Sequence, residues 1–309
     1  MLTMQQRLRM LETPKGRVDL VLDTDAFNEI DDQFAISYAI KSTDRLALKA
    51  LYAAPFLNKR SESPADGMEK SYREIMKLLE LAGTDYPVFR GSQTYLADER
   101  TPVLSAAAQD LAQRAMQYAP DKPLYVVAIG AITNVASALL LQPEIADRVV
   151  IVWLGGHALE WHDNREFNIY QDVAAARVVM NSGAPLVLLP CMGVVNAFAT
   201  TGPELAYWLA GKNALADYLY RQTCDAANAY AAGRVWSRPI WDVTAVGWLL
   251  NKDNRFMLDK LIPTPIPEYD HHYAQSPNRP LCRYVYHIKR DALMGDLFAR
   301  VCSEERPAQ

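Results

Sequence analysis

The chain lacks the features that mark several large classes of protein. It has four cysteines among 309 residues and no CxxC pair, which argues against a zinc finger or a disulfide scaffold and favours reduced thiols. No run approaches the roughly 18 consecutive apolar residues that a membrane helix requires. The N-terminus has no apolar block typical of a signal peptide. We therefore expect a cytoplasmic protein with no membrane partner.

A strong excess of either charge is also missing. The formal net charge is −4, so the chain has no general attraction to nucleic acid or to anionic lipid. With 50% apolar and 22% charged residues, the composition is that of a packed globular protein. Because no repeat, linker or low-complexity tract interrupts it, we predict a single domain covering residues 1–309.

Short apolar runs alternate with longer helical patterns along the chain. Runs typical of strands lie at residues 18–22, 46–54, 87–89, 124–129, 149–154 and 186–189, and helical patterns at 30–40, 66–82, 103–118, 133–141 and 172–181. This alternation predicts an α/β fold with a Rossmann-like, mostly parallel sheet and helices on both faces. Residues 201–235 predict a helical cap over the strand ends, and residues 262–287 predict C-terminal antiparallel strands.

Ligands of such sheets bind at the carboxyl ends of the strands. Residues 23–25, 55–58, 129–131 and 154–168 all follow predicted strands, so we expect them to form one rim.

An acidic cluster follows the first predicted strand. Between Asp23 and Asp32 the chain places four aspartates and a glutamate within ten residues. Mutual repulsion makes such a cluster costly unless a cation compensates it, and carboxylate ligands favour a hard metal such as calcium or magnesium.

Two alternatives to a metal site stay open from these residues. Acidic residues at a helix start stabilise the helix dipole without a metal. A DxD after a first strand is also typical of phosphoryl-transfer enzymes, although Phe27 and the lack of a glycine-rich loop disfavour that interpretation.

Four segments, in order, resemble the signatures of the nucleoside hydrolases, the calcium-dependent N-ribohydrolases. The acidic cluster resembles DxDPGxDD, and residues 128–136 resemble TGPLTNxA. Residues 154–156 with 166–172 resemble MGG…AEFNxxxDPEAA, and Trp241-Asp242 resembles a late HD or WD pair. The match spans roughly residues 17–250. It implies the nucleoside hydrolase fold and a glycosidase of purine salvage that cleaves small-molecule ribonucleosides to free base and ribose. It also implies a homodimer or homotetramer.

The resemblance also implies roles for individual residues. Calcium (Ca²⁺) would be held by Asp25, Asp32, the backbone carbonyl of Ile129 and Asp242. Asp25 would also take the proton from the calcium-bound water that attacks C1′ of the ribose. The implied contacts to the sugar are Asp31, Asn28, Asn58, Asn164, Glu166 and Asn168.

The departures from the signatures bear on specificity. The loop after the first strand is two residues longer than DxDPGxDD, which adds Asn28 to the sugar contacts. Trp241 replaces the histidine that protonates the leaving base in many members, and it resembles purine-selective members in which an indole stacks on the base. We therefore lean toward purine ribosides. His157 and His162 are candidates for the missing acid, and Trp161, Trp236 and Tyr230 are further aromatic candidates for the base pocket.

Cationic residues flank the expected site at Lys59, Arg60 and Arg234. They form either a solvated loop or a contact for an anionic or polar substituent of the substrate. Such a contact would allow a non-standard ribosyl compound as substrate. Because Trp241 replaces the leaving-group histidine, the alternative function is a ribosyl-ligand binder or a catalytically altered relative that acts on such a compound.

Overall fold

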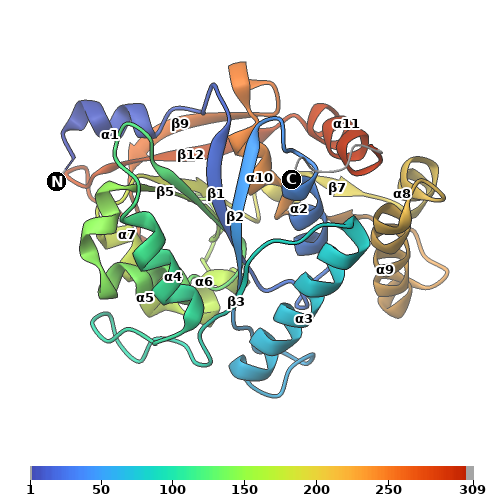
Figure 1. Cartoon of the computed structure of the whole chain (residues 1–309), viewed down its shortest axis with the longest axis horizontal. Helices are drawn as coiled ribbons and strands as arrows, with labels where there is room; N and C mark the ends of the chain where they lie inside the picture. The colour runs from blue at the N-terminus through green and yellow to red at the C-terminus, as the bar shows by residue number, and fades with distance from the viewer. Residues whose placement is uncertain (1, 304–309) are drawn as a thin grey trace.

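An eight-stranded sheet forms the centre of the chain in the computed structural model, which describes residues 2–303 (Figure 1). The strand order is β3-β2-β1-β4-β5-β6-β12-β9, and every pair of neighbours is parallel except β12 and β9. Its strands are β1 (Val18–Thr24), β2 (Leu46–Ala53), β3 (Val88–Arg90), β4 (Leu124–Ala128), β5 (Val149–Leu154), β6 (Leu186–Leu189), β9 (Met257–Pro263) and β12 (Leu281–Ile288). Two short antiparallel pairs join β7 (Ala199–Thr200) to β8 (Arg238–Pro239), and β10 (Ile266–Pro267) to β11 (Tyr273–Ala274). The predicted parallel sheet and C-terminal antiparallel strands are confirmed.

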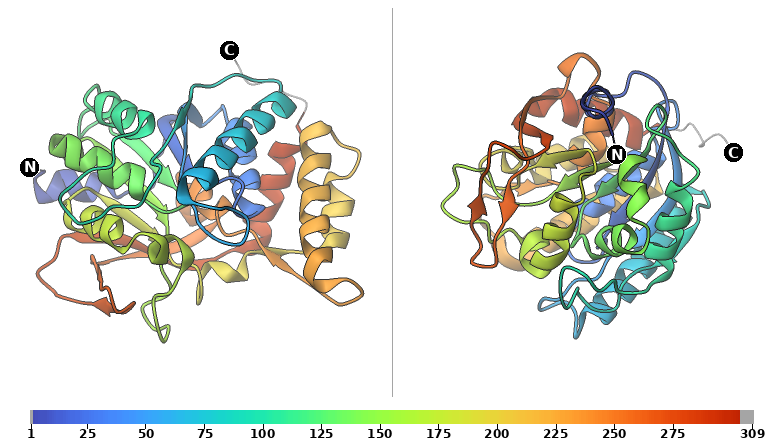
Figure 2. Two further views of the ribbon diagram at one scale, coloured as in Figure 1. Left: turned by 90° about the horizontal axis from the view of Figure 1, so that it is seen from below. Right: turned by 90° about the vertical axis from the view of Figure 1, so that its left-hand side faces the viewer.

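Helices cover both faces of this sheet (Figures 1 and 2). On one face α5 packs between α4 and α7, and on the other α2 contacts α3, α10 and α11. Their bounds are α2 (Asp31–Ile40), α3 (Pro64–Ala82), α4 (Ala106–Ala115), α5 (Thr133–Leu141), α7 (Val173–Asn181), α10 (Val243–Leu249) and α11 (Arg290–Val301). The remaining helices are α1 (Met4–Met10), α6 (Phe167–Gln171), α8 (Gly202–Leu209) and α9 (Ala214–Ala231).

The strand side chains explain why two helical layers are needed. Along β1, Leu20 and Leu22 join the core under α2, whereas Val21 joins the core under α5. Successive side chains of a strand point to opposite faces, so the consecutive apolar residues Leu20, Val21 and Leu22 must be covered on both. Val152 and Trp153 of β5 divide between the two cores in the same way.

The strand order places a crevice beside β1. The chain runs from β1 outward to β2 and β3, then returns to β4 on the other side of β1. Connections leaving β1 and β4 therefore diverge at their carboxyl ends, which is where ligands bind in open α/β sheets. Asp25 and Ile129 follow these two strands directly, and Asp23 pairs with Ala128 in the β1–β4 register. The sheet thus brings two of the predicted site segments together.

The predicted helices within residues 201–235 are present as α8 and α9. The helices α8 and α9 stand at one side of the molecule, and α9 packs against α2 and α3 (Figures 1 and 2). No residue of 201–235 lines the cavity at the strand ends. Residues of α9, among them Tyr230, line a neighbouring cavity that shares Asn28 and Glu29 with it. None of the helices within residues 2–303 combines the length and apolar character that crossing a membrane demands. The assignment of residues 1–309 to one domain stays a prediction, because residues 1 and 304–309 lie outside the described residues.

Candidate active site

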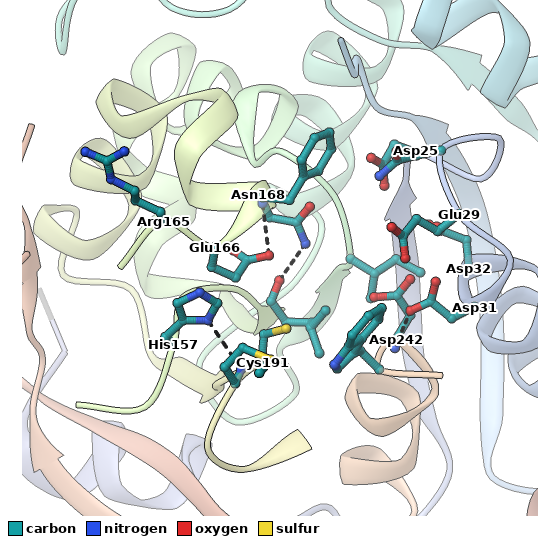
Figure 3. Close-up of a pocket in the computed structure, with 16 residues that line it drawn as sticks. Asp25, Glu29, Asp31, Asp32, His157, Arg165, Glu166, Asn168, Cys191 and Asp242 are labelled. Atoms are coloured by element: carbon teal, nitrogen blue, oxygen red, sulfur yellow. Dashed lines mark hydrogen bonds between the residues drawn. The ribbon is translucent and has the colours of Figure 1, made fainter. Parts of the chain in front are cut away.

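A cavity of about 240 Å³ opens at the carboxyl ends of the central strands (Figure 3). Five segments far apart in the sequence supply its walls. They are residues 25–32 after β1, Ile129 after β4, residues 154–168 after β5, residues 191–192 after β6, and residues 241–242 before α10. Four of the five contain residues predicted from the sequence, and residues 191–192 were not predicted.

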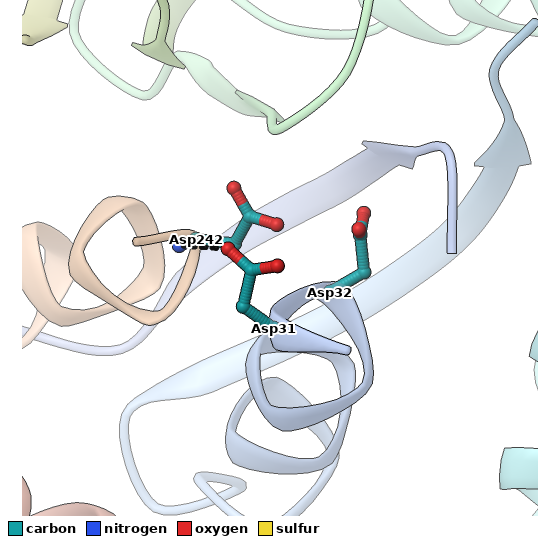
Figure 4. A group of neighbouring side chains, drawn as sticks. All are labelled: Asp31, Asp32 and Asp242. Atoms are coloured by element: carbon teal, nitrogen blue, oxygen red, sulfur yellow. Dashed lines mark hydrogen bonds between the residues drawn. The ribbon is translucent and has the colours of Figure 1, made fainter. Parts of the chain in front are cut away.

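Three buried aspartates meet on one side of this cavity (Figure 4). One carboxylate oxygen each from Asp31, Asp32 and Asp242 lies within 4.8 Å of the others. Asp31 and Asp32 begin α2, and Asp242 directly precedes α10. The Asp242 backbone N–H donates to Asp31 Oδ2 at 3.4 Å, and the Thr24 hydroxyl donates to Asp32 Oδ1 at 2.5 Å. The group is therefore held by both secondary structure and hydrogen bonds.

Asp25 lines the same cavity but does not belong to that close group. Its Oδ1 lies against Gly130, where a Cβ would stand only 2.8 Å away, so the loop after β4 needs a glycine there. Its Oδ2 is buried without a hydrogen-bond partner among residues 2–303. An orphaned carboxylate oxygen is costly to bury and indicates a group that a ligand completes.

The electrostatics of the site favour binding of a cation. Burial, together with repulsion between the carboxylates, raises the pKa values of Asp25, Asp32 and Asp242 well above their usual range. Burial also raises the pKa of Asp31, although Arg238 opposes this rise. A cation would stabilise all four ionised forms at once. An all-oxygen donor set fits a hard divalent ion, so the residues present suit a metal.

The predicted sugar contacts Glu166 and Asn168 lie across the cavity from the aspartates (Figure 3). Glu166 accepts hydrogen bonds from the backbone N–H groups of Gly156, Asn168 and Ile169 at 2.9, 3.0 and 3.1 Å, and thereby caps α6. Asn168 Nδ2 donates to the carbonyl of Leu154 at 3.0 Å. Both side chains are therefore fixed before any substrate binds.

The three predicted asparagines occupy different places. Asn28 lines the cavity, whereas Asn58 lies behind it and donates from Nδ2 to Asn28 Oδ1 at 2.6 Å. Asn164 does not line the cavity either, because its Oδ1 accepts from the His157 backbone N–H at 2.9 Å beneath the loop. Asn58 and Asn164 thus support residues of the wall, and direct contacts from them to a sugar stay predictions that this placement does not favour.

Trp241 lines the cavity beside a cation that the sequence analysis missed. The Arg238 guanidinium lies 5.6 Å from the centre of the indole and forms an ion pair with Glu29, which also lines the cavity. Burial raises the pKa of Glu29 to about 7, with Asp31 adding to the rise and Arg238 opposing it. In the sequence, Arg238 is marked only by its position three residues before Trp241.

The remaining candidates divide between the cavity and its surroundings. His157 lines the cavity, whereas His162 is exposed and lies 3.5 Å from Asp163. Lys59 and Arg60 line a neighbouring cavity, where Arg60 donates to the Asn28 carbonyl at 3.0 Å. Tyr230 also lines that neighbouring cavity. Arg234, Trp161 and Trp236 line neither of the two cavities. Met192 and Cys191 were missed because nothing in their local sequence marks them.

Comparisons with known proteins agree on one family. The sequence model described as "Inosine-uridine preferring nucleoside hydrolase" matches residues 20–276. The chain is 25% identical to the pyrimidine-specific ribonucleoside hydrolase RihA of Enterobacter sp. (strain 638), over 79% of this chain and 82% of that protein. It is 27% identical to the non-specific ribonucleoside hydrolase RihC of Salmonella paratyphi B (strain ATCC BAA-1250 / SPB7), over 76% and 79% of the two chains. Among solved structures, the plant nucleoside hydrolase PpNRh1 superimposes with a TM-score of 0.74 at 21% identity, covering 93% of this chain and 99% of that one.

Proposed function

Because the chain belongs to the inosine-uridine preferring nucleoside hydrolase family, we propose that it hydrolyses the N-glycosidic bond of ribonucleosides, with a preference for purine ribosides. The products are the free base and ribose. The observation that carries this proposal is the group of buried carboxylates in a cavity at the crevice between β1 and β4. The cytoplasmic location and the homodimer or homotetramer implied by the resemblance stay predictions.

The metal in this proposal is calcium, held by Asp25, Asp32, Asp242 and the backbone carbonyl of Ile129. Bound calcium would orient the attacking water and lower its pKa. The raised pKa values of the three carboxylates support this assignment, because a cation removes the repulsion that contributes to them. Asp31 stands close enough to Asp32 and Asp242 to be a metal ligand itself, but we assign it to a sugar hydroxyl.

Asp25 is the general base in this proposal. Its Oδ2 has no hydrogen-bond partner among the described residues, so it is free to accept a proton from a water in the cavity. Burial strengthens a carboxylate base by raising its pKa, provided that a cation keeps it ionised in the resting enzyme. The surrounding carboxylates favour the positive charge that develops on the ribosyl group as the glycosidic bond breaks.

Glu166 and Asn168 would hold the sugar while Asp25 acts. Their hydrogen bonds to the backbone fix both side chains, so little conformational entropy is lost when the ribose binds. Asn28 extends this set from the loop after β1, with its amide oxygen oriented by Asn58.

The preference for purines rests on Trp241. An indole offers a large aromatic face on which a two-ring base stacks more extensively than a single ring. Arg238 lies over one face of the ring, which leaves the opposite face for the base.

The test is the release of reducing sugar from inosine, adenosine, guanosine, uridine and cytidine, with calcium and then with a chelator. We expect calcium-dependent ribose release that is fastest for the purine ribosides. Faster cleavage of uridine or cytidine would contradict the assignment of Trp241. If no nucleoside is cleaved although calcium binds, the protein is instead a ribosyl-ligand binder or acts on another ribosyl compound.

A further inference from the structure

The short hairpin of β10 and β11 contacts the loop that follows β5, although about a hundred residues separate the two segments. Its strands pair Pro267 with Tyr273. Arg177 of α7 anchors the first strand, because its guanidinium donates to the Pro267 carbonyl at 2.9 Å and to the Glu268 carboxylate at 2.7 Å. The hairpin is therefore fixed to the helical layer beside the site.

The turn of this hairpin reaches the loop after β5 through His271. The His271 carbonyl accepts from the Asn164 backbone N–H at 2.7 Å. His271 has a φ of 65°, in the left-handed region that a residue other than glycine adopts only at some cost. Its ring also lies 5.3 Å from the ring of Tyr170 in α6. Two contacts thus connect the hairpin to residues 164–170, the segment that contains Glu166.

The Tyr273 hydroxyl occupies the place that a side chain at Gly156 would take. A Cβ at Gly156 would overlap the Tyr273 oxygen, and the φ of Gly156 is +79°, so only glycine fits next to this hydroxyl. The Gly156 N–H donates to Glu166 Oε2 at 2.9 Å, and the Gly156 carbonyl accepts from the Cys191 N–H at 2.7 Å. Burial raises the pKa of Tyr273, and the Glu166 carboxylate adds to the rise, so the phenol stays protonated near that carboxylate.

One backbone group thus links the hairpin to a side chain of the proposed sugar site. We propose that Tyr273 is a positioning residue whose hydroxyl, packed against Gly156, holds the turn that fixes the Glu166 carboxylate in the orientation that the sugar requires. This inference rests on the proposed function. Without the hydroxyl, a space opens beside Gly156 and the turn can move into it. A displacement of about 1 Å at a group that holds a substrate costs up to about 10²-fold in rate.

The experiment is a double-mutant cycle of Tyr273→Phe and Glu166→Ala, measured with a ribonucleoside that the wild type cleaves. Phenylalanine keeps the ring, so the Tyr273→Phe protein should fold. It should raise KM about tenfold and lower kcat less than threefold, because a displaced Glu166 weakens binding of the sugar. In the Glu166→Ala background, the same substitution should lower kcat/KM less than twofold, since the carboxylate through which it acts is gone. Losses that multiply in the double variant would overturn the inference, because they indicate two residues that act separately.

The matched control is Tyr284→Phe. The Tyr284 hydroxyl accepts from the Leu159 N–H at 3.1 Å, so this variant removes the same atom beside the same loop but leaves the contact at Gly156 intact. It should keep KM within about twofold of the wild-type value. An increase in KM equal to that in Tyr273→Phe would overturn the inference, because loosening of the whole loop would then explain both results.

The proposed function and this inference can fail separately. If the wild type cleaves no ribonucleoside, the proposed function fails, and the same cycle is measured by calorimetric titration of D-ribose in the presence of calcium. An affinity that Tyr273→Phe lowers about tenfold in the wild-type background, and less than twofold in the Glu166→Ala background, would support the positioning role. Losses of affinity that multiply, or a wild type that binds no ribose, would overturn it.

Discussion

Replacing Asp23 by Asn tests the electrostatic description of the site without removing a proposed ligand. Asp23 lies in β1 and is completely buried. Its Oδ1 accepts from Asn134 Nδ2 at 2.8 Å, whereas its Oδ2 has no hydrogen-bond partner among the described residues. Burial raises the pKa of Asp23 from its ordinary value of 3.8 to about 7, and the bond from Asn134 offsets part of the rise.

The size and sign of the effect on stability follow from the difference between the pKa of Asp23 in the folded protein and its ordinary value. Raising a pKa from 3.8 to about 7 corresponds to about 4 kcal/mol of free energy. The folded protein holds the Asp23 proton up to about pH 7, whereas the unfolded chain releases it near pH 4. Wild-type stability therefore falls by about 1.4 kcal/mol per pH unit between these values, and an amide at this position removes that slope. The free energy of unfolding of Asp23→Asn, relative to that of the wild type, should therefore increase by about 3 kcal/mol from pH 5 to pH 7.

The assay is urea unfolding of both proteins in the presence of a chelator, at pH 5, 6, 7 and 8. Ser92→Ala is the matched control, because it removes a neutral hydroxyl bonded to the same Asn134. It should change the free energy of unfolding equally at every pH. If the Asp23→Asn and wild-type curves run parallel between pH 5 and pH 7, the buried carboxyl is not what makes the native state pH-sensitive.

Four further predictions concern activity and metal binding. Asp25→Asn should lower kcat by about 10³-fold without changing the circular dichroism spectrum, as expected for loss of a general base; retained turnover would remove Asp25 from that role. Asp31→Asn should raise KM for the riboside and leave calcium affinity within about threefold by calorimetry, whereas a loss of about tenfold or more would make Asp31 a metal ligand. Trp241→Ala should lower kcat/KM about tenfold for inosine and less for uridine, as measured by ribose release. Gly130→Ala places a Cβ 2.8 Å from Asp25 Oδ1 and should reduce kcat, whereas Gly16→Ala, with no atom within 4 Å of the added Cβ, should not.

The rim of the sheet is the part of the site that sequence reasoning reached most directly. Buried parallel strands are apolar throughout, so the runs at 18–22 and 124–129 are recognisable without knowledge of their partners. Asp242 precedes α10 and was expected in the site only from the resemblance to the nucleoside hydrolases. Parallel strands end at one edge, which brings Asp25 and Ile129 into one cavity although more than a hundred residues separate them. That conclusion needs only the order of the elements.

Details inside the rim depend on loop paths that periodicity does not encode. The loop after β1 turns at Asp25, whose carbonyl accepts from the Asn28 N–H at 2.7 Å, and Asn28 then stands in front of Asn58. Asn164 illustrates the same limit, because its amide is used to hold the His157 backbone. Polar residues at a predicted rim therefore include both those that face a ligand and those that support their neighbours.

Arg238 shows why the Trp241-Asp242 motif does not decide base preference by itself. The lengthened loop after β1 carries Glu29 to Arg238, which in turn lies over the indole of Trp241. The surface offered to a base is thus set by two segments that meet only in the folded protein. One relative is named pyrimidine-specific and another non-specific, and at 25–27% identity neither name fixes the base that this wall accepts. Because an ion pair with Glu29 anchors Arg238 over one face of the indole, a base that stacks on Trp241 as proposed would use the other face.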